Sequence, residues 1–490
     1  MDIHVILNGR QDLTGQIYRQ LRAGILDGRL ASGMRLPSTR DLARQLGVSR
    51  KTTLDVFERL TTEGYLRTRA GDGTFVAEGL ARVPVSPEPG SIETGKGASV
   101  WETMQVLLTP PTPPKIQPFD FVGGVTDKRL FPFEPWRRCM NHAMRAQVRG
   151  RADYYAAAGE QELRLAISRY LAYSRSVVST WQDVLVTHGA QQALDLLARV
   201  LVKPGDTVAV EDPGYPPARA CFEALGARVV GVRVDANGLV VDALPAHTRV
   251  VYVTPAHQFP LGMPMSLERR VALLEWAQRN KAMIIEDDYD SEYRFEGRPM
   301  ESLKSLDRAG LVAYVGTFSK TIFPELRVGY LVPPHALHTA LSTAKKISDW
   351  HTNTMMQTAL AKFMLDGAFA KHLRRMHKHY EQRRNALLAH LRGPLAPWLE
   401  AIAPAAGIHL SARLRRDALP GVTEADVIEA AAAQSVGLHG LSMFYRAHAA
   451  EPGLIFGYGG IDVEAIDEAL TRLARVFDTL AQGTRTKVAA

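Results

Sequence analysis

A lysine stands among residues that suit imine chemistry. Lys320 follows Ser319 in the run Val315–Thr321, which reads as a strand that leaves into a loop, and Arg327 lies seven residues further on. A lysine amine can form an imine with an aldehyde, and a serine hydroxyl and an arginine can hold a phosphate group. A lysine with this role should be partly buried, so that its pKa is lowered. A surface lysine after a strand would have the same sequence, and the sequence leaves that alternative open.

An acidic run lies upstream of this lysine. The apolar strand pattern of Ile284–Ile285 continues into Glu286–Asp288 and then Tyr289. An aspartate opposite a pyridine nitrogen keeps the ring protonated, and a nearby tyrosine can bond the ring 3-oxygen. The amine, the acid and the phosphate-binding cation are together what pyridoxal phosphate requires. Taken alone, the acids Glu286, Asp287 and Asp288 fit a solvated acidic turn better than a cofactor site.

A phosphate-binding turn is expected between a strand and a helix, because free N–H groups at a helix N-terminus attract anions. The segment Thr187–Leu194 fits this expectation, since the strand Val184–Val186 precedes it and Gly189 begins it. Any strand-to-helix turn would look similar. The hypothesis that this turn binds phosphate therefore depends on the presence of Ser319, Lys320 and Arg327 in the same chain.

The elements that must position these residues alternate between helices and short apolar strands. Such alternation from about Phe119 onward predicts an α/β fold with a largely parallel sheet. The expected strands are Val184–Val186, Thr207–Val210, Val229–Val232, Val250–Val253 and Met283–Ile285.

The N-terminal region follows a different pattern. Residues 13–28 form an amphipathic stripe, Ser38 is expected to cap a second helix that ends at Gly47, and Ser49 caps a third that runs to Gly64. A two-stranded hairpin around a glycine-rich turn follows over 65–76. Three helices and a hairpin predict a winged helix-turn-helix whose third helix enters the DNA major groove. A small helical bundle for protein contact remains an alternative.

Composition limits the class of protein. The 490 residues carry a net charge of +8, and residues 1–77 hold 12 Lys and Arg against 8 Asp and Glu, which favours a polyanionic partner there. The two cysteines are too few for a disulfide framework or a cysteine metal site, and no metal is expected. The chain has no long apolar run and no signal-peptide pattern at Met1–Val5. A cytoplasmic location is therefore expected.

Four separated motifs in the first 77 residues closely resemble the GntR family of bacterial regulators. They are Arg35–Arg40, Leu46–Arg50, Glu63–Leu66 and Gly73–Val76. The resemblance implies contacts with double-stranded DNA, with glycines in the wing. The implied residues are Arg35, Ser38, Thr39, Arg40, Ser49, Arg50, Thr52, Gly71 and Gly73.

Residues 119–480 resemble fold-type-I aminotransferases, through Gly189–Gln191, Asp212–Tyr215, Thr254–Gly262, Asp287–Tyr289 and Ser319–Lys320 with Arg327. The whole chain is thus similar to the MocR/GabR subfamily of GntR regulators. The resemblance implies an internal aldimine of pyridoxal phosphate at Lys320, with Asp287 on the ring nitrogen and Tyr289 on the 3-oxygen. It also implies a stacking role for Tyr215 and a homodimer in which Tyr154 or Tyr155 reaches the partner's site. The implied phosphate ligands are Gly189, Ala190, Gln191, Ser319 and Arg327.

The expected organisation follows from both resemblances. A winged helix-turn-helix domain spans residues 10–78, a Pro/Gly-rich linker spans 79–117, and an aminotransferase-like sensor domain with a smaller C-terminal α+β subdomain spans 118–482. The predicted function is transcriptional regulation that senses an amine or pyridoxal phosphate itself at Lys320. The alternative is an aminotransferase that carries an accessory DNA-binding domain.

One position departs from the aminotransferase pattern. An arginine that clamps the substrate carboxylate is usual in the late strand, and Ile455 stands there in this chain. Efficient turnover of ordinary amino acids is therefore not expected, and any transaminase activity should be vestigial. Arg219 and Arg413 are the candidates for replacing the missing cation.

Overall fold

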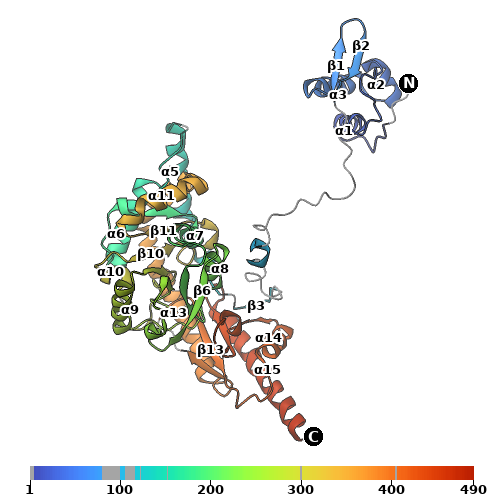
Figure 1. The fold of residues 1–490 in the computed structure, drawn as a ribbon. Coiled ribbons are helices and arrows are strands. Elements are labelled where there is room, and N and C mark those ends of the chain that lie inside the picture. Colours follow the sequence, from blue (N-terminus) through green and yellow to red (C-terminus); the bar gives the residue numbers. More distant parts are fainter. Residues whose placement is uncertain are drawn as a thin grey trace. The chain divides into compact units, whose positions relative to one another are not determined.

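The computed structural model describes residues 5–79, 100–104, 116–121, 123–151, 153–297, 301–402 and 406–489. The chain divides into two compact units, Met1–Gly97 and Ala98–Ala490. Both are drawn in Figure 1, and each is described by itself below. Most of the predicted linker, 79–117, falls outside the described residues.

The N-terminal unit has three helices and a two-stranded wing, as predicted. Ser38 Oγ accepts a hydrogen bond from the Asp41 amide at 3.2 Å, and Ser49 Oγ accepts one from the Thr52 amide at 3.1 Å, so both serines cap their helices. Gly47 ends the second helix in the left-handed conformation, with φ of 67°. The elements are α1 (Leu13–Leu26), α2 (Thr39–Leu46), α3 (Arg50–Thr62), β1 (Leu66–Arg69) and β2 (Gly73–Val76).

The core of this unit joins the helices to the wing. Ile17 and Leu21 of α1 pack with Val56 and Leu60 of α3, and Val76 closes the cluster from β2. The Thr53 hydroxyl is fully buried and donates to the Thr39 carbonyl oxygen at 2.7 Å, which ties α3 to α2. The first turn of α3 is therefore held at a defined angle to α2.

An eight-stranded sheet forms the centre of the second unit, in the order β4-β11-β10-β9-β8-β5-β6-β7. The strands from β10 to β6 in this order run parallel, whereas β11 is antiparallel to both neighbours and β7 is an antiparallel edge. The largely parallel sheet expected from the sequence is confirmed. The strands are β4 (Leu185–Thr187), β5 (Thr207–Asp212), β6 (Arg228–Asp235), β7 (Gly238–Leu239), β8 (Thr248–Val253), β9 (Met283–Asp288), β10 (Val312–Thr317) and β11 (Gly329–Val332).

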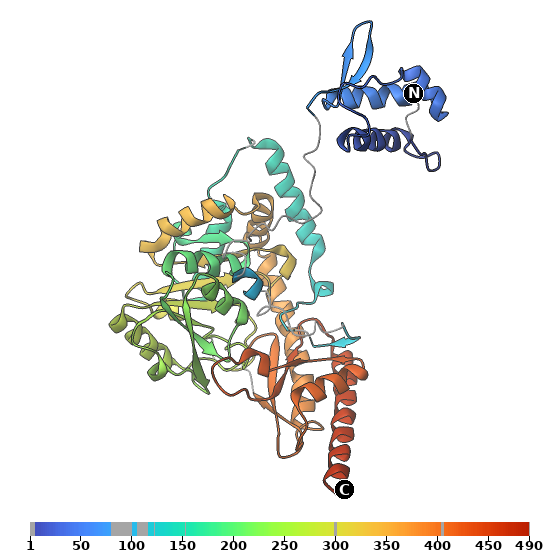
Figure 2. The same cartoon turned by 45° about the vertical axis from the view of Figure 1, so that its right-hand side comes forward.

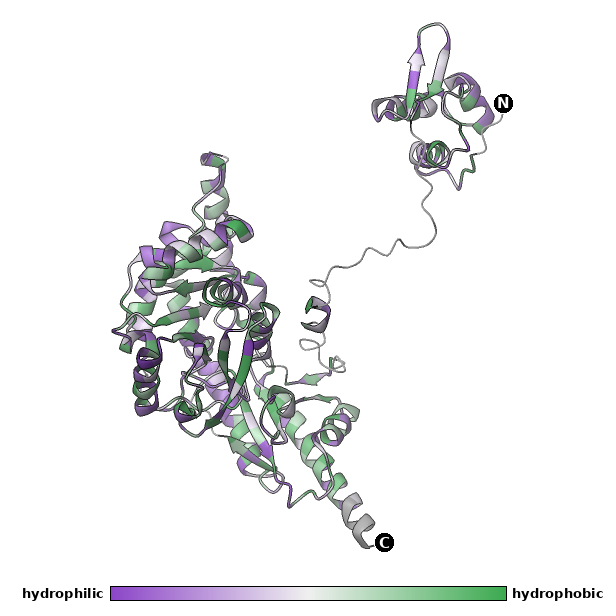
Figure 3. Cartoon of the chain, viewed as in Figure 1, coloured by the Kyte–Doolittle hydropathy of each residue, from purple (hydrophilic) through white to green (hydrophobic). Residues whose placement is uncertain are grey.

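Helices cover both faces of this sheet, which explains why its strands read as continuous apolar runs. Leu194 and Leu197 of α7 pack on one face, and Leu273 and Trp276 of α9 pack on the other. Figure 3 shows α9 with hydrophilic and hydrophobic residues, whereas the strands are mainly hydrophobic. The helices are α5 (Phe133–Arg149), α6 (Gln161–Arg175), α7 (Gly189–Leu201), α8 (Pro216–Ala224), α9 (Leu267–Asn280), α10 (Leu303–Leu306), α11 (His335–Asp349), α12 (Thr354–Leu365) and α13 (Ala368–Arg392).

A smaller α+β part follows α13. Its four strands lie in the order β12-β13-β16-β15, and β14 pairs separately with β3 near the start of the unit. Figure 2 shows the last helix, in red, running beside this part to the C-terminus. The elements are β3 (Phe119–Asp120), β12 (Leu399–Ile402), β13 (His409–Leu414), α14 (Glu424–Ala433), β14 (Val436–Gly437), β15 (His439–Gly440), β16 (Gly453–Gly457) and α15 (Val463–Ala489).

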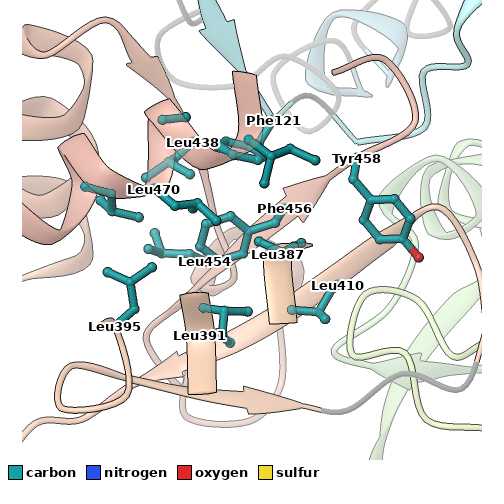
Figure 4. Packing of buried hydrophobic residues seen from close by; sticks show 14 of the residues in the cluster. Phe121, Leu387, Leu391, Leu395, Leu410, Leu438, Leu454, Phe456, Tyr458 and Leu470 are labelled. Carbon is teal, nitrogen blue, oxygen red and sulfur yellow. The ribbon is translucent and has the colours of Figure 1, made fainter. Parts of the chain in front are cut away.

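The core of the smaller part gathers residues that are far apart in the chain. Phe121 meets Phe456 of β16 edge to face, with ring centroids 5.4 Å apart. Leu391 of α13 and Leu470 of α15 belong to the same cluster (Figure 4). This cluster anchors β13 and β16, which both contribute residues to the site described next. None of the helices in the described ranges has the length and apolar character needed to cross a bilayer.

Candidate functional site

The residues expected to bind a cofactor lie around one cavity of about 410 Å³ at the carboxyl ends of β9 and β10. Ligands of open α/β sheets bind at this edge, because loops there diverge and leave a crevice. Asp287 is the penultimate residue of β9, and Lys320 lies in the loop after β10. The cavity is lined by Gly123, Gly124, Ala190, Gln191, Tyr215, Tyr252, Thr254, Phe259, Asp287, Tyr289, Asp290, Thr317, Ser319, Lys320, Pro324, Arg327, Ile408, His409, His439, Phe444 and Ile455.

Lys320 is half-buried and its Nζ donates to the carbonyl oxygen of Gly124 at 2.8 Å. Burial lowers the pKa of the Lys320 amine, while the carboxylates of Asp290 and Asp287 oppose this shift. A lowered pKa increases the fraction of neutral, nucleophilic amine at neutral pH. The lysine is therefore suited to attack a carbonyl carbon.

Gly124 makes room for this lysine. It has a φ of 75°, and a Cβ atom there would lie 2.6 Å from Lys320 Nζ. The Gly123–Gly124 pair was not among the predicted site residues, although adjacent glycines outside a regular element are a signal of close approach.

The acids at the end of β9 are buried, so the alternative of a solvated acidic turn is wrong. Glu286, Asp287 and Asp288 are 1%, 4% and 7% exposed. Because side chains alternate along a strand, only Asp287 of the three lines the cavity. Glu286 accepts from the backbone amides of Leu303 and Lys304 instead.

The two carboxylate oxygens of Asp287 differ in their hydrogen bonding. Its Oδ2 accepts a hydrogen bond from the Tyr252 hydroxyl at 2.7 Å, whereas Oδ1 is buried and has no hydrogen-bond partner among the described residues. Burial raises the pKa of Asp287 to about 7. The hydrogen bond from Tyr252 and the charge of Lys320 act in the opposite direction and lower this pKa. An unpaired buried carboxylate oxygen fits the protonated ring nitrogen of pyridoxal phosphate. The sequence analysis did not predict Tyr252 as a site residue. The available signal was a polar hydroxyl on β8, the strand that pairs with β9.

The residues expected to bind a phosphate group meet near the N-terminus of α7. Gly189 begins the helix with a φ of 70°, and a Cβ there would lie 3.1 Å from Nη2 of Arg327. Ser319 lies on the adjacent loop, where its amide donates to Thr317 Oγ1 at 3.1 Å. Ala190 and Gln191 line the same cavity. Helix amides, a guanidinium and a hydroxyl thus converge, and this set of donors suits a phosphate group.

Two tyrosines, Tyr215 and Tyr289, line the same cavity. Tyr215 caps α8, and burial raises its pKa to about 12. Its ring meets Phe259 at 5.5 Å between centroids. The Tyr289 hydroxyl donates to the backbone carbonyl of His257 at 2.9 Å, and burial holds its pKa well above the usual range. Both tyrosines line the cavity that also contains Lys320.

A buried histidine pair adjoins the cavity and was also missed. His257 Nδ1 lies 2.9 Å from Asp290 Oδ1, and the His257 and His409 rings are 4.6 Å apart. Burial lowers the pKa of His409 to about 3, so its imidazole is neutral at neutral pH. The two histidines come from different parts of the unit, which is why spacing in the sequence does not reveal the pair.

The residues expected to contact DNA lie on one end of the N-terminal unit's helices and on the wing. Arg40 and Arg50 are exposed at the starts of α2 and α3. Arg35 is bridged to Phe75 of the wing, and its guanidinium lies against Gly73, where a Cβ would be 3.1 Å from Nε. Thr39 and Thr52 are half-buried in the first turns of the two helices, Ser38 and Ser49 are exposed, and Gly71 has a φ of 82° in the turn of the wing.

Comparisons with known proteins match both units. The family described as bacterial regulatory proteins of the gntR family matches residues 13–76, and aminotransferase class I and II matches residues 126–441. The probable rhizopine catabolism regulatory protein MocR of Rhizobium meliloti is 37% identical over 464 residues, which cover 94% of this chain and 93% of that protein. The pyridoxine biosynthesis transcriptional regulator PdxR of Corynebacterium glutamicum is 31% identical, over 96% and 98% of the two chains.

Solved structures match the second unit. Kynurenine aminotransferase of Pyrococcus horikoshii, in complex with PMP, superposes with a TM-score of 0.69 at 27% identity, covering 80% of this chain and 98% of that one. The α-aminoadipate aminotransferase LysN of Thermus thermophilus, complexed with a phosphopyridoxyl-leucine, gives 0.69 at 28% identity, over 79% and 98%. The smaller sheet and the large sheet are therefore those of a fold-type-I enzyme.

A winged helix joined to this fold defines a DNA-binding transcriptional regulator with a pyridoxal-phosphate domain. Pyridoxal phosphate is the cofactor of that fold, and the free oxygen of Asp287 and the cup at Gly189 fit it. The chain belongs to the MocR/GabR subfamily of GntR-family transcriptional regulators.

Proposed function

We propose that this regulator senses its effector at Lys320 and transmits the result to the N-terminal unit that binds its operator. The observation that carries the proposal is that Lys320, whose pKa is lowered by burial, lies in the same site as Asp287, whose buried Oδ1 has no partner in the described part of the chain. Both line one cavity. The effector is an amine or pyridoxal phosphate itself, and the protein acts in the cytoplasm on double-stranded DNA.

When bound, pyridoxal phosphate supplies an aldehyde that condenses with a primary amine. Lys320 offers the amine, and Gly124 keeps its Nζ in the cavity through a backbone hydrogen bond. Asp287 Oδ1 would accept a hydrogen bond from the protonated ring nitrogen, while the Tyr252 hydroxyl donates to the other carboxylate oxygen. Gly189, Ala190, Gln191, Ser319 and Arg327 are proposed to bind the phosphate, and Tyr215 and Tyr289 to contact the ring.

The dimer is part of the proposal. Tyr154 is 71% exposed and packs against Trp350, itself 51% exposed, with centroids 4.5 Å apart. Ile347 on α11 is also exposed. This apolar surface supports a homodimer in which Tyr154 or Tyr155 approaches the partner's site. Sedimentation of the purified protein tests it, and a monomer at micromolar concentration would contradict it.

The proposed function is tested by trapping the cofactor. Borohydride reduction of the loaded protein, followed by peptide mapping, should label Lys320. Lys320→Ala should lose the label and the absorbance of the cofactor bound to lysine, whereas the exposed Lys203→Ala should retain both. Binding of the promoter next to the protein's own gene is measured on the same samples. Labelling of a different lysine, or DNA binding that no amine or cofactor alters, contradicts the proposal.

An aminotransferase with an accessory DNA-binding domain is the second candidate. The retained Lys320 and Asp287 favour it, as does the similarity to aminotransferase structures. Ile455 counts against efficient turnover, because an apolar side chain cannot pair with a substrate carboxylate. Steady formation of a keto acid from an amino acid, with no effect on operator binding, would select this alternative.

A further inference from the structure

The cavity extends beyond Lys320 toward the smaller sheet, and this far end has its own chemistry. It is formed by Ile408 and His409 at the start of β13, His439 of β15, Phe444 of the short helix Ser442–Phe444, and Ile455 of β16. Ile455 is 3% exposed and packs with Leu441 and Ile402. An effector whose amine reaches Lys320 would place its other end here, so these side chains select its chemical class.

Charge is unevenly distributed along the cavity. Among the described residues that line it, the arginine and lysine side chains are Arg327 and Lys320, both of which serve the cofactor in the proposed function. Asp290 adds a fully buried carboxyl group near the far end. The described residues of this chain therefore place no cation beside a ligand carboxylate at the far end, and burying an unpaired carboxylate is strongly unfavourable.

The two candidates for a replacement cation do not line the cavity. Arg413 lies further along β13, where its Nε donates to Glu451 Oε2 at 2.6 Å. Arg219 lies on α8, and burial lowers its pKa, with Arg446 adding to the effect. Neither arginine is placed to clamp a carboxylate at Ile455 in this structure.

The polar groups at the far end are neutral. Burial lowers the pKa of His439, as it does that of His409, so both imidazoles are uncharged at neutral pH. His409 Nε2 lies 3.2 Å from the carbonyl oxygen of Pro260, which only accepts. The Nε2 atom therefore carries the proton, and Nδ1 remains an acceptor. An acceptor favours a ligand hydroxyl or N–H and disfavours a carboxylate.

Aromatic side chains form the adjoining wall. Phe259 meets Phe444 at 5.1 Å and His409 at 5.6 Å between ring centroids. This wall suits the carbon skeleton of a ligand. Together with the neutral imidazoles it describes a subsite for an uncharged, hydroxylated group.

We infer that the effector is a primary amine that carries a hydroxyl group and no carboxylate, and that Ile455 and His409 select it. This inference rests on the proposed function, since it assumes that the amine is read at Lys320. It goes further by naming the ligand class and the residues that set it.

Pairs of ligands that differ only at the far end test the inference. The loaded protein is titrated with 3-amino-1-propanol and with β-alanine, and with 4-aminocyclohexanol and 4-aminocyclohexanecarboxylate, while cofactor absorbance and operator affinity are followed. We expect the amino alcohol of each pair to bind at least about tenfold more tightly. Tighter binding of the amino acids, or a response to free pyridoxal phosphate alone, overturns the inference.

A variant makes the test independent of ligand choice. Ile455→Arg should reverse the preference within each pair, whereas Ile455→Leu, which keeps an apolar side chain, should preserve it. If Ile455→Arg does not fold, the comparison within the unmodified protein still decides. Borohydride labelling of Lys320 without ligand separates the two proposals. A labelled protein that prefers carboxylates contradicts this inference only, whereas loss of any lysine label contradicts the proposed function.

Discussion

The Nζ atom of Lys320 lies against the backbone of Gly124, close enough that a Cβ at position 124 would be 2.6 Å away. The two residues are separated by nearly 200 positions, and the hydrogen bond from Nζ to the Gly124 carbonyl joins them. Lys320 is thus positioned by the segment around Gly124 as well as by β10, the strand that precedes it. This contact leads to the first prediction.

Gly124→Ala should displace the Lys320 amine and weaken retention of pyridoxal phosphate by about tenfold or more. The added methyl group overlaps Nζ, and the φ of 75° at this position is unfavourable for alanine. Absorbance titration with the cofactor measures the effect. Gly123→Ala is the matched control, because a Cβ there would meet no atom of the described residues beyond its chain neighbours within 4 Å. Equal cofactor affinity in the two variants would contradict the placement of Lys320.

Asp287→Asn should change how stability depends on pH in the cofactor-free protein. Burial raises the pKa of Asp287 to about 7, whereas in an unfolded chain it is about 3.9. The native state therefore binds more protons than the unfolded state between these values, and this group makes stability fall as pH rises from about 4 to 7. The variant lacks that contribution, so its free energy of unfolding should fall less over this range.

Urea unfolding at pH 5 and pH 7 measures this difference. Each pH unit within the window contributes at most about 1.4 kcal/mol, so the two proteins should differ by about 1–3 kcal/mol in their pH 5 to pH 7 change. Glu211, whose pKa burial also raises to about 7, titrates in both proteins, and the charge of Asp287 adds a smaller part of its shift that the variant also removes. Identical pH profiles would show that Asp287 is not held in this environment.

Tyr252→Phe should weaken cofactor binding without removing a cofactor contact. The Tyr252 hydroxyl donates to Asp287 Oδ2 at 2.7 Å, and its loss leaves a second buried oxygen of that carboxylate unpaired. The pKa of Asp287 should rise further, because this hydrogen bond stabilises the charged form. The expected cost is about 1–3 kcal/mol, read as reduced cofactor affinity. Tyr314→Phe, at a tyrosine bonded to Asp288 instead, is the comparison that should leave cofactor affinity closer to the unmodified value.

Arg50→Ala should weaken operator binding by about 1–3 kcal/mol if its guanidinium contacts a base edge. Arg50 is exposed in the first turn of α3, next to the capping serine Ser49. If it contacts a phosphate instead, affinity for all sequences should fall alike and the dependence on salt should become shallower. Gel-shift or fluorescence titrations at several salt concentrations separate the two. Arg19→Ala, an exposed arginine on α1, is the control; an equal loss there would argue against α3 as the reading helix.

Local chemistry allowed much of this protein to be predicted from its sequence. Ser38, Gly47 and Ser49 marked helix ends correctly, because capping depends on one side chain and the amides beside it. The apolar runs of the large sheet were recognised for a similar reason, since strands covered on both faces must be hydrophobic along their length. Lys320, Asp287 and Arg327 were singled out by residue type and spacing, and they do line one cavity.

Contacts between distant segments could not be read in this way. Which acid of Glu286–Asp288 faces the cavity depends on how β9 sits between β8 and β10, and this also places Tyr252 beside Asp287. The far end of the cavity depends on the smaller sheet, which brings His409 and Ile455 to the same space as Lys320.

The sequence by itself thus determined the elements and the reactive groups, because these follow from local hydrogen bonding and hydrophobic patterning. Only the tertiary structure decided the burial that shifts the pKa values of Lys320 and Asp287, and the neutral surroundings at Ile455. The physical reason is that desolvation and charge pairing depend on every element packed around a group. Packing of that kind is a property of the folded chain.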